Sequence, residues 1–224
     1  MFMPMLDTNL SAAASVTITT NETSQFTASN RSVYTVIANA GAGGFVVMSF
    51  SSRELNASDA ISVTSITIDG VTATVVEEGG TGAGAILSTV AYADGVSSGT
   101  VTVVVTYTDT ASELVWATYT ITGHTSTTPH DTKTATGNGV TASVSLNIPA
   151  GGCAVCLAGF LDGGTSGDNL TYVGVVENNS VGGFGQQFGW GSDSVMGVET
   201  GRTVSVSFDP GTAEDYNIIS ISWG

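Results

Sequence analysis

Two cysteines have a spacing that could do chemistry. They lie in GGCAVCLAGF as Cys153 and Cys156, and a C-x-x-C spacing is typical of redox pairs and of zinc sites. A redox pair needs a helix N-terminus to lower the thiol pKa, and a zinc site needs two further ligands. This segment reads as a strand, on which residues three apart point to opposite faces. We therefore expect two small core thiols and neither chemistry.

Acidic residues could serve a glycoside hydrolase, which needs two carboxylates about 5 to 10 Å apart across the sugar. Glu77 and Glu78 are adjacent, so on a strand they point in opposite directions. Asp162, Asp168 and Glu177 are interpreted as solvated turn residues. We expect no catalytic residues and a protein that is not an enzyme, and a sandwich-fold glycoside hydrolase is the least favoured alternative.

Metal and nucleophile patterns are weak. The stretch DGGTSGDN (162–169) carries oxygen ligands but does not match an EF-hand loop, so whether it binds a structural Ca²⁺ stays open. His124 and His130 stand six apart in a polar stretch without further ligands. No G-x-S-x-G motif accompanies them. We expect no metal site and no cofactor.

The stretch VGGFGQQFGWGSDS (181–194) favours binding or packing more than catalysis. On a strand, Gln186, Phe188 and Trp190 share one face, while Gln187 and glycines share the other. An exposed row of this kind could contact a glycan through Gln186, Gln187 and Trp190. Aromatic residues opposite glycine are also typical of a thin strand between two packed layers or at a subunit interface, which we favour.

Alternating apolar residues separated by glycine-rich turns fill most of the chain, with about fifteen candidate strands and no convincing amphipathic helix. The pattern predicts an all-β, antiparallel β-sandwich or jelly roll. In SITIDGVTATVV, Asp69-Gly70 predicts a type I′ hairpin that pairs Thr67 with Thr72. One face of this hairpin is expected to be buried: Ile66, Ile68, Val71, Ala73 and Val75.

Four pairs of segments indicate an internal duplication, in the same order in each half. GGFVVMSFSS resembles GGCAVCLAGF, SITIDGVTATVVEE resembles LTYVGVVENN, TVTVVVTYTD resembles TVSVSFDPGT, and VWATYTITG resembles NIISISWG. We predict an N-terminal arm over residues 1–30 and a sandwich over 31–224, with halves at 31–123 and 140–224. One continuous sandwich is favoured over two in tandem.

The charge distribution excludes several classes of partner. Four Lys and Arg residues against nineteen Asp and Glu give a net charge of −15, and the cations are scattered. Without a basic stripe, binding to nucleic acid is not expected. An anionic membrane would repel the chain, and no apolar run approaches the length of a span, so membrane insertion is not expected either. The start, MFMPMLDTNLSAAAS, does not read as a signal peptide.

The strand-and-turn pattern of residues 32–224 resembles that of β-sandwich virion proteins of tailed bacteriophages, in particular marine alphaproteobacterial phages. The segments that carry the resemblance are GFVVMSF, SITIDGVTATVVEE, ILSTVAYADGVSSGTVTVVVTY, VWATYTITG, ASVSLNIPAGGCAVCLAGF and NIISISWG. The resemblance implies a non-catalytic structural or attachment protein on the virion surface, as capsid decoration, head fibre or tail fibre, made in the host cytoplasm. It also implies a homo-oligomer, expected to be a trimer, that contacts other virion proteins.

The apolar start of the arm is the expected assembly interface, formed by Phe2, Met3, Met5 and Leu6, and packing of this segment on the chain's own domain is the open alternative. Exposed apolar residues at a chain end are typical of segments that dock on a partner. Head and tail locations both stay open. The alternative function is a lectin-like module that binds a host surface glycan through the 181–194 stretch.

Overall fold

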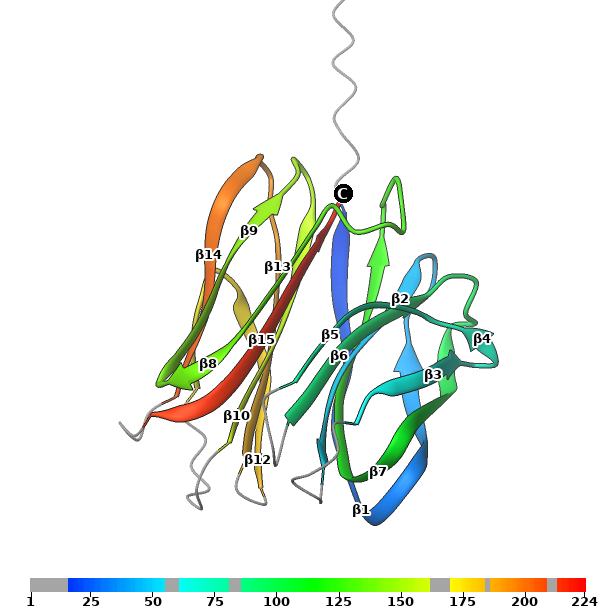
Figure 1. Ribbon diagram of the computed structural model, residues 1–224. Helices are drawn as coiled ribbons and strands as arrows, with labels where there is room; N and C mark the ends of the chain where they lie inside the picture. Colours follow the sequence, from blue (N-terminus) through cyan, green and yellow to red (C-terminus); the bar gives the residue numbers. More distant parts are fainter. Residues whose placement is uncertain (1–15, 55–60, 81–85, 162–169, 184–185, 209–212) are drawn as a thin grey trace, which may run out of the picture.

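A computed structural model describes residues 16–54, 61–80, 86–161, 170–183, 186–208 and 213–224 (Figure 1). These residues form fifteen strands and no helix, and all their strand pairings are antiparallel, which confirms the predicted fold class. The strands are β1 (Thr17–Ala40), β2 (Phe45–Glu54), β3 (Val63–Ile68), β4 (Val71–Thr72), β5 (Thr74–Gly80), β6 (Ile86–Ala93), β7 (Gly99–Thr122), β8 (Asp131–Gly139), β9 (Thr141–Ile148), β10 (Cys153–Leu161), β11 (Leu170–Val173), β12 (Val176–Gly183), β13 (Gln186–Ser194), β14 (Glu199–Phe208) and β15 (Glu214–Trp223).

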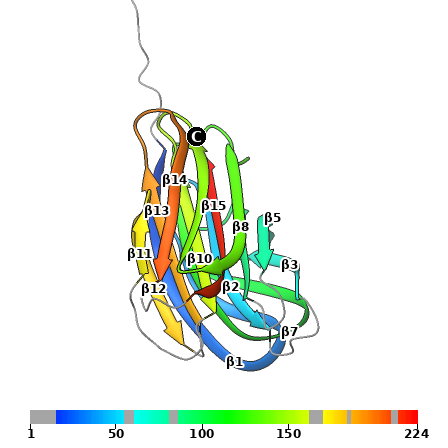
Figure 2. The ribbon, with the colours of Figure 1, turned by 60° about the vertical axis from the view of Figure 1, so that its left-hand side comes forward.

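The strands make four layers (Figure 2). The first sheet folds over itself, because β1 and β7 are long and bend together where their register shifts, between Thr27 and Val33. Layer 1 contains the second part of β1, the first part of β7, β3 and β4; layer 2 contains the first part of β1, the second part of β7, β2, β6 and β5. Layer 3 is the sheet β12-β13-β10-β15-β8, and layer 4 is β11-β14-β9. A hydrophobic core fills each of the three spaces between the layers.

The Asp-Gly hairpin forms as predicted. Asp69 and Gly70 both have positive φ, at 52° and 78°, as a type I′ turn requires. Thr67 pairs with Thr72, and Ile66 and Ile68 are buried. Val75 was expected on the same buried face but is exposed, because after Ala73 the chain leaves β3 and pairs with β6 instead.

The two halves of the chain have the same strand wiring. Layer 2 runs β1-β7-β2-β6-β5 and layer 3 runs β8-β15-β10-β13-β12, while β1-β7-β3 in layer 1 corresponds to β9-β14-β11 in layer 4. The four segment pairs noticed in the sequence fall on corresponding strands. The correspondence also covers β1 from Thr17 and β8 from Asp131, so the predicted boundary at residue 30 lies inside β1, and residues 131–139 belong to the second half.

The two halves are related by an approximate two-fold rotation across the core that layers 2 and 3 share. The first part of β1 corresponds to β8, and β5 corresponds to β12; β1 lies against β12, and β5 lies against β8. The two partners thus exchange roles across the interface, as a two-fold relation requires. The described strands form two sandwiches that share a middle core, rather than one continuous double sheet. The first packs four strands of layer 1 on five of layer 2, and the second packs three strands of layer 4 on five of layer 3.

A glycine pair before β2 and another before β10 explain the repeated GG of the sequence. Gly43 and Gly151 have positive φ, at 82° and 69°, which favours glycine. A Cβ on Gly44 would lie 2.0 Å from the carbonyl oxygen of Ile121, and one on Gly152 would lie 2.4 Å from that of Trp223. Both halves therefore start their central strand by passing directly over the backbone of the last strand.

Candidate functional site

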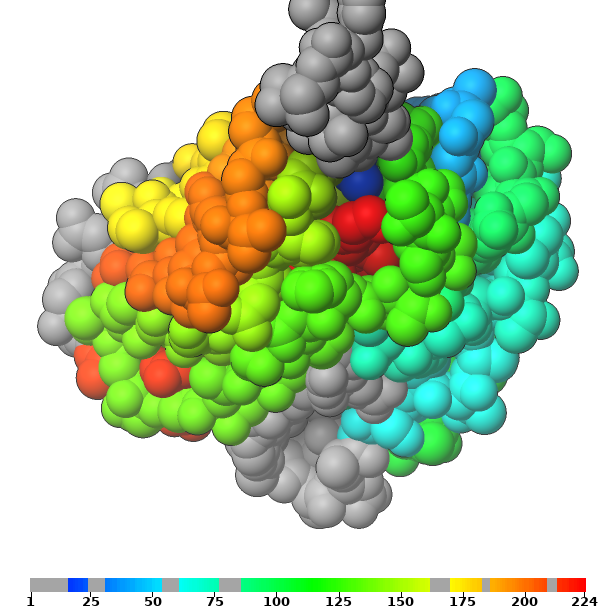
Figure 3. Space-filling view, turned by 90° about the horizontal axis from the view of Figure 1, so that it is seen from above, coloured from blue at the N-terminus to red at the C-terminus, as the bar shows by residue number. Residues whose placement is uncertain are grey.

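One end of the molecule, the upper end in Figure 1, joins segments that are distant in sequence. The backbone N–H of Val16 donates to the carbonyl oxygen of Gly151 (2.7 Å), and the N–H of Val195 donates to that of Gly152 (2.8 Å). Val16 is buried in the shared core. Seen from above in Figure 3, the start of β1 lies beside the end of β15. The turn at Gly151 and Gly152 therefore holds the start of the described chain and the turn after β13 together.

Two large apolar side chains are exposed at this end. Met196 is 88% exposed and Val198 is 71% exposed, directly after the buried Val195. Large apolar side chains exposed close together on a turn are candidates for contact with a partner. Sequence reasoning missed this pair, although an apolar M-G-V turn between two predicted strands was a usable signal.

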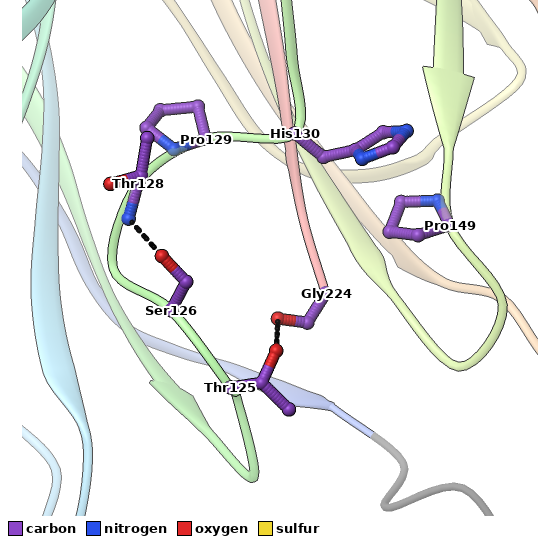
Figure 4. A pocket seen from close by; sticks show the side chains of 7 residues that line it. All are labelled: Thr125, Ser126, Thr128, Pro129, His130, Pro149 and Gly224. Atoms are coloured by element: carbon purple, nitrogen blue, oxygen red, sulfur yellow. Dashed lines mark hydrogen bonds between the residues drawn. The ribbon is translucent and has the colours of Figure 1, made fainter.

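A pocket of about 400 Å³ opens at the same end, between the segment that links the two halves and the end of β15 (Figure 4). Its walls offer hydroxyl groups, two proline rings and one imidazole, from Thr125, Ser126, Thr128, Pro129, His130, Pro149 and Gly224. Thr125 donates its hydroxyl to the carbonyl oxygen of Gly224 (3.1 Å), and Trp223 donates its indole N–H to that of Thr127 (3.0 Å). These bonds attach the linking segment to the last strand.

The predicted assembly residues Phe2, Met3, Met5 and Leu6 lie outside the described residues. The chain that carries them joins the described part at Val16, so it meets the fold at the upper end.

The predicted glycan contacts are wrong in this fold. Gln186, Gln187 and Trp190 are all buried, so no sugar can reach them from solvent. The reason is that β13 pairs on both sides and is covered on both faces, by layer 2 and by layer 4. Phe188 and Trp190 belong to the shared core. On the opposite face, a Cβ on Gly189 would lie on the hydroxyl of Tyr172, which confirms the interpretation of a thin strand between packed layers.

Gln186 instead takes part in a polar contact between the halves. With its amide oriented to satisfy both groups, its N–H₂ donates to Glu113 (2.6 Å) and its oxygen accepts from the Arg53 Nε (3.2 Å). Arg53 and Glu113 are register partners in β2 and β7, and Glu113 is buried. A buried charge is retained only with partners of this kind. The contact joins layer 2 to layer 3 through side chains that the sequence does not bring together.

The two cysteines behave as predicted. Cys153 contributes to the shared core, and Cys156 contributes to the core between layers 3 and 4, so they point to opposite faces of β10. Both are free and buried, and burial raises the pKa of each thiol to about 12. A thiol with that pKa is a poor nucleophile and metal ligand at neutral pH.

The other candidate groups remain separate. Glu77 and Glu78 occupy adjacent positions of β5, opposite Val90 and Thr89. The His124 ring packs edge-on against Phe45 (4.7 Å between centroids), and His130 lines the pocket. The 162–169 stretch lies outside the described residues. In the part of the chain that is described, no three His, Cys, Asp or Glu residues gather as metal ligands would.

Comparison of the chain with protein-family models, with curated proteins and with solved structures gives no match. Within the described ranges, no helix has the length and apolar character needed to cross a membrane.

Proposed function

We propose that the protein is a structural or attachment component of the surface of a tailed bacteriophage particle, which acts by binding and assembly. The observation that carries the proposal is the position of Val16. Its burial and its bond to Gly151 fix the point from which the apolar segment with Phe2, Met3, Met5 and Leu6 extends. That point lies at the same end as the exposed Met196 and Val198.

Two further features support an assembly role. Three hydrophobic cores lie between the four layers of strands, and local opening of such a structure is rare, which protects a particle protein from proteolysis. The chain also contains only four Lys and Arg residues, so it offers few sites to trypsin-like proteases.

The test is incorporation into particles. Phage particles that carry the full chain are compared with particles from the same genome encoding a chain without residues 2–10. We expect mass spectrometry of purified particles to detect the full chain and to find the shortened chain lost or strongly reduced. We expect the shortened chain to retain the circular dichroism and urea midpoint of the full chain, because the three cores of the described residues are formed without residues 2–10.

A matched variant separates the arm from the exposed turn. Met196→Ser with Val198→Ser keeps the arm and removes the exposed apolar pair. Reduced incorporation of this variant would assign part of the contact to the turn. Absence of the full chain from particles contradicts the proposed function, and normal incorporation of the shortened chain contradicts the role of the arm.

A further inference from the structure

The outer face of layer 1, here called the β1 face, consists of side chains that point away from the core on β1, β7 and β3. Its members are Val33, Thr35 and Ile37 of β1, Thr102, Val104 and Thr106 of β7, and Ser65 and Thr67 of β3. The register places them in rows that cross β1, β7 and β3 in that order. One row is Val33, Thr106 and Ser65, and another is Thr35, Val104 and Thr67. Its side chains are either hydroxyl-bearing or aliphatic.

An aliphatic group occupies the centre of this face. Ile37 is 58% exposed and Val33 is 45% exposed, on the same side of one strand, and the half-buried Val104 lies on the next strand at the row between them. Core residues alternate with them, since Tyr34, Val36 and Ala38 are buried. The exposure of Val33 and Ile37 is therefore not required by packing within the chain.

Charge indicates which partner can cover the face. The chain carries −15, so two copies repel each other over most of their surface. The β1 face carries charge only at its ends, with Arg31 at one end and, at the other, Asp69 and the Glu22 carboxylate that accepts a hydrogen bond from Asn39 (2.9 Å). Two copies can approach most closely where both are uncharged and apolar area is removed from water. Among the described strands, β1 also pairs only with β7, so this face borders an edge that a second strand or sheet can extend.

We propose that the β1 face binds the β1 face of a second copy in a two-fold contact. The whole layer 1 part of β1, residues 31–40, is about 33 Å long, and three to four strands are about 10 to 15 Å wide, so the outer face of layer 1 with its ends included gives a footprint on the order of 500 Å² per copy. Two such faces reach the lower end of specific interfaces, which predicts weak, concentration-dependent association. The inference deepens the proposed function, because it names a second copy of the chain as one partner in the particle.

The outer face of layer 4 provides a matched control. It corresponds to the β1 face in the other half and also exposes hydroxyl side chains, such as Ser143 and Thr203. Its single large exposed aliphatic residue on β11, Val173, is 54% exposed, close to the value for Ile37. It has no second aliphatic neighbour comparable to Val33 among the outward residues of β9 and β14. Glutamate at position 173 adds the same charge at similar exposure.

Sedimentation velocity of the purified full chain, over a concentration series at two salt concentrations, tests the contact. Going from about 0.01 M to about 1 M salt shortens the Debye length from about 30 Å to about 3 Å, so screening should strengthen the association. We expect a monomer–dimer equilibrium that is tighter in high salt. Ile37→Glu and, separately, Val33→Glu should weaken it at least about tenfold, and Val173→Glu should leave it unchanged within about twofold.

Circular dichroism and urea midpoints equal to those of the wild type establish that each variant is folded. A wild-type chain that stays monomeric at both salt concentrations overturns the proposal, as does an equal effect of Ile37→Glu and Val173→Glu. A closed trimer overturns it as well, since a two-fold contact of one face with itself closes at two copies. Each of these results leaves the particle-incorporation test unaffected, so failure of this contact is distinguishable from failure of the proposed function.

Discussion

The two halves of the molecule share their wiring but differ at their corners. In the first half, β1 and β7 pass unbroken from layer 2 to layer 1, whereas in the second half the same paths are divided into β8 and β9 and into β14 and β15. The break between β8 and β9 lies at Val140, whose carbonyl oxygen accepts a hydrogen bond from the N–H of Phe208 (2.8 Å). Paired strands and buried faces are thus reproduced in both halves, while the continuity of the corners is not.

The shared core shows a second difference, at its two-fold centre. Ser51 of β2 pairs with Ser88 and Val115, and the corresponding Gly159 of β10 pairs with Phe188 and Asn217. Ser51 and Ser88 share a hydrogen bond (2.7 Å), and Ser88 donates to Asn217 (2.8 Å). Ser51, Ser88 and Asn217 therefore form a polar cluster on one side of the two-fold axis. The corresponding positions on the other side of the axis hold Gly159, Phe188 and Val115. A two-fold wiring tolerates such asymmetry because each contact only has to be satisfied locally.

The largest expected effect concerns residues that correspond across the shared core. Trp190 pairs with Leu157, and Val90 pairs with Ser49 at the corresponding position. Both side chains are buried in this core. We expect Trp190→Ala to lower the free energy of unfolding by about 4 kcal/mol, because it leaves a large cavity. Val90→Ala should lower it by about 2 kcal/mol, since it removes two methyl groups. Urea unfolding measures both changes. Equal losses would contradict a larger contribution of Trp190 than of Val90 to the stability of the shared core.

The next effect tests the glycines that start the central strands. Alanine at position 44 or 152 would place its Cβ against a backbone carbonyl oxygen, which cannot rotate away. We expect Gly44→Ala and Gly152→Ala each to lower the free energy of unfolding by about 3 kcal/mol. Gly197→Ala is the control, because a Cβ there meets nothing within 4 Å, and its change should stay within about 0.5 kcal/mol. A result near the control for either central glycine would break the equivalence of the halves.

The sheets can be predicted from the sequence because apolar residues alternate along each strand and so mark its buried face. Ile66, Ile68, Val101 and Val103 are buried as the alternation predicts, and the Asp-Gly turn sets the register of the first hairpin. Alternation along a strand does not say what covers its second face. For that reason Gln186 and Trp190 could be interpreted as a surface, and only the packing of layers 2 and 4 on β13 identifies them as interior.

The same limit applies to the candidate sites. Met196 and Val198 are exposed after the buried Val195, and the only local signal for them is the apolar M-G-V sequence of this turn, which does not say how far the side chains are exposed. The contact of Gln186 with Arg53 and Glu113 needs three strands from two halves to meet. The first strand of each half was also missed as part of the repeat, because β1 up to residue 30 is rich in Thr, Ser and Asn, β8 is rich in Thr and Gly, and aliphatic residues are sparse in both.

A smaller effect is expected from the polar centre of the shared core. Asn217→Ala removes the acceptor of the Ser88 hydroxyl and should lower the free energy of unfolding by about 2 kcal/mol. Replacing both groups, with Ser88→Ala and Asn217→Ala, should recover about 1 kcal/mol relative to the sum of the two single changes, because each single change already includes the loss of the bond between Ser88 and Asn217. A double-mutant cycle by urea unfolding measures this coupling. Strict additivity would mean that the bond does not join the halves energetically.

The smallest effect is expected at the start of β8, at the far end of that strand from the break at Val140, and this effect depends on pH. Partial burial opposes ionisation of Asp131, but hydrogen bonds from Lys133 and from the backbone N–H groups of Asn147 and Thr132 hold its pKa below the usual value. A lowered pKa in the folded state stabilises the fold above about pH 4, and this contribution is lost as the pH falls through the folded pKa.

Asp131→Asn should therefore lower the free energy of unfolding by about 1 kcal/mol at neutral pH, and the difference from the wild type should shrink in acid. Thr19 occupies the corresponding position, since Thr19 pairs with Thr120 as Asp131 pairs with Ser222. Thr19→Ala is the control, and its effect should not change with pH because no titrating group is removed. Urea unfolding between about pH 3 and about pH 7 measures both variants. A difference for Asp131→Asn that persists unchanged below about pH 3 would contradict a charged Asp131 that accepts these hydrogen bonds.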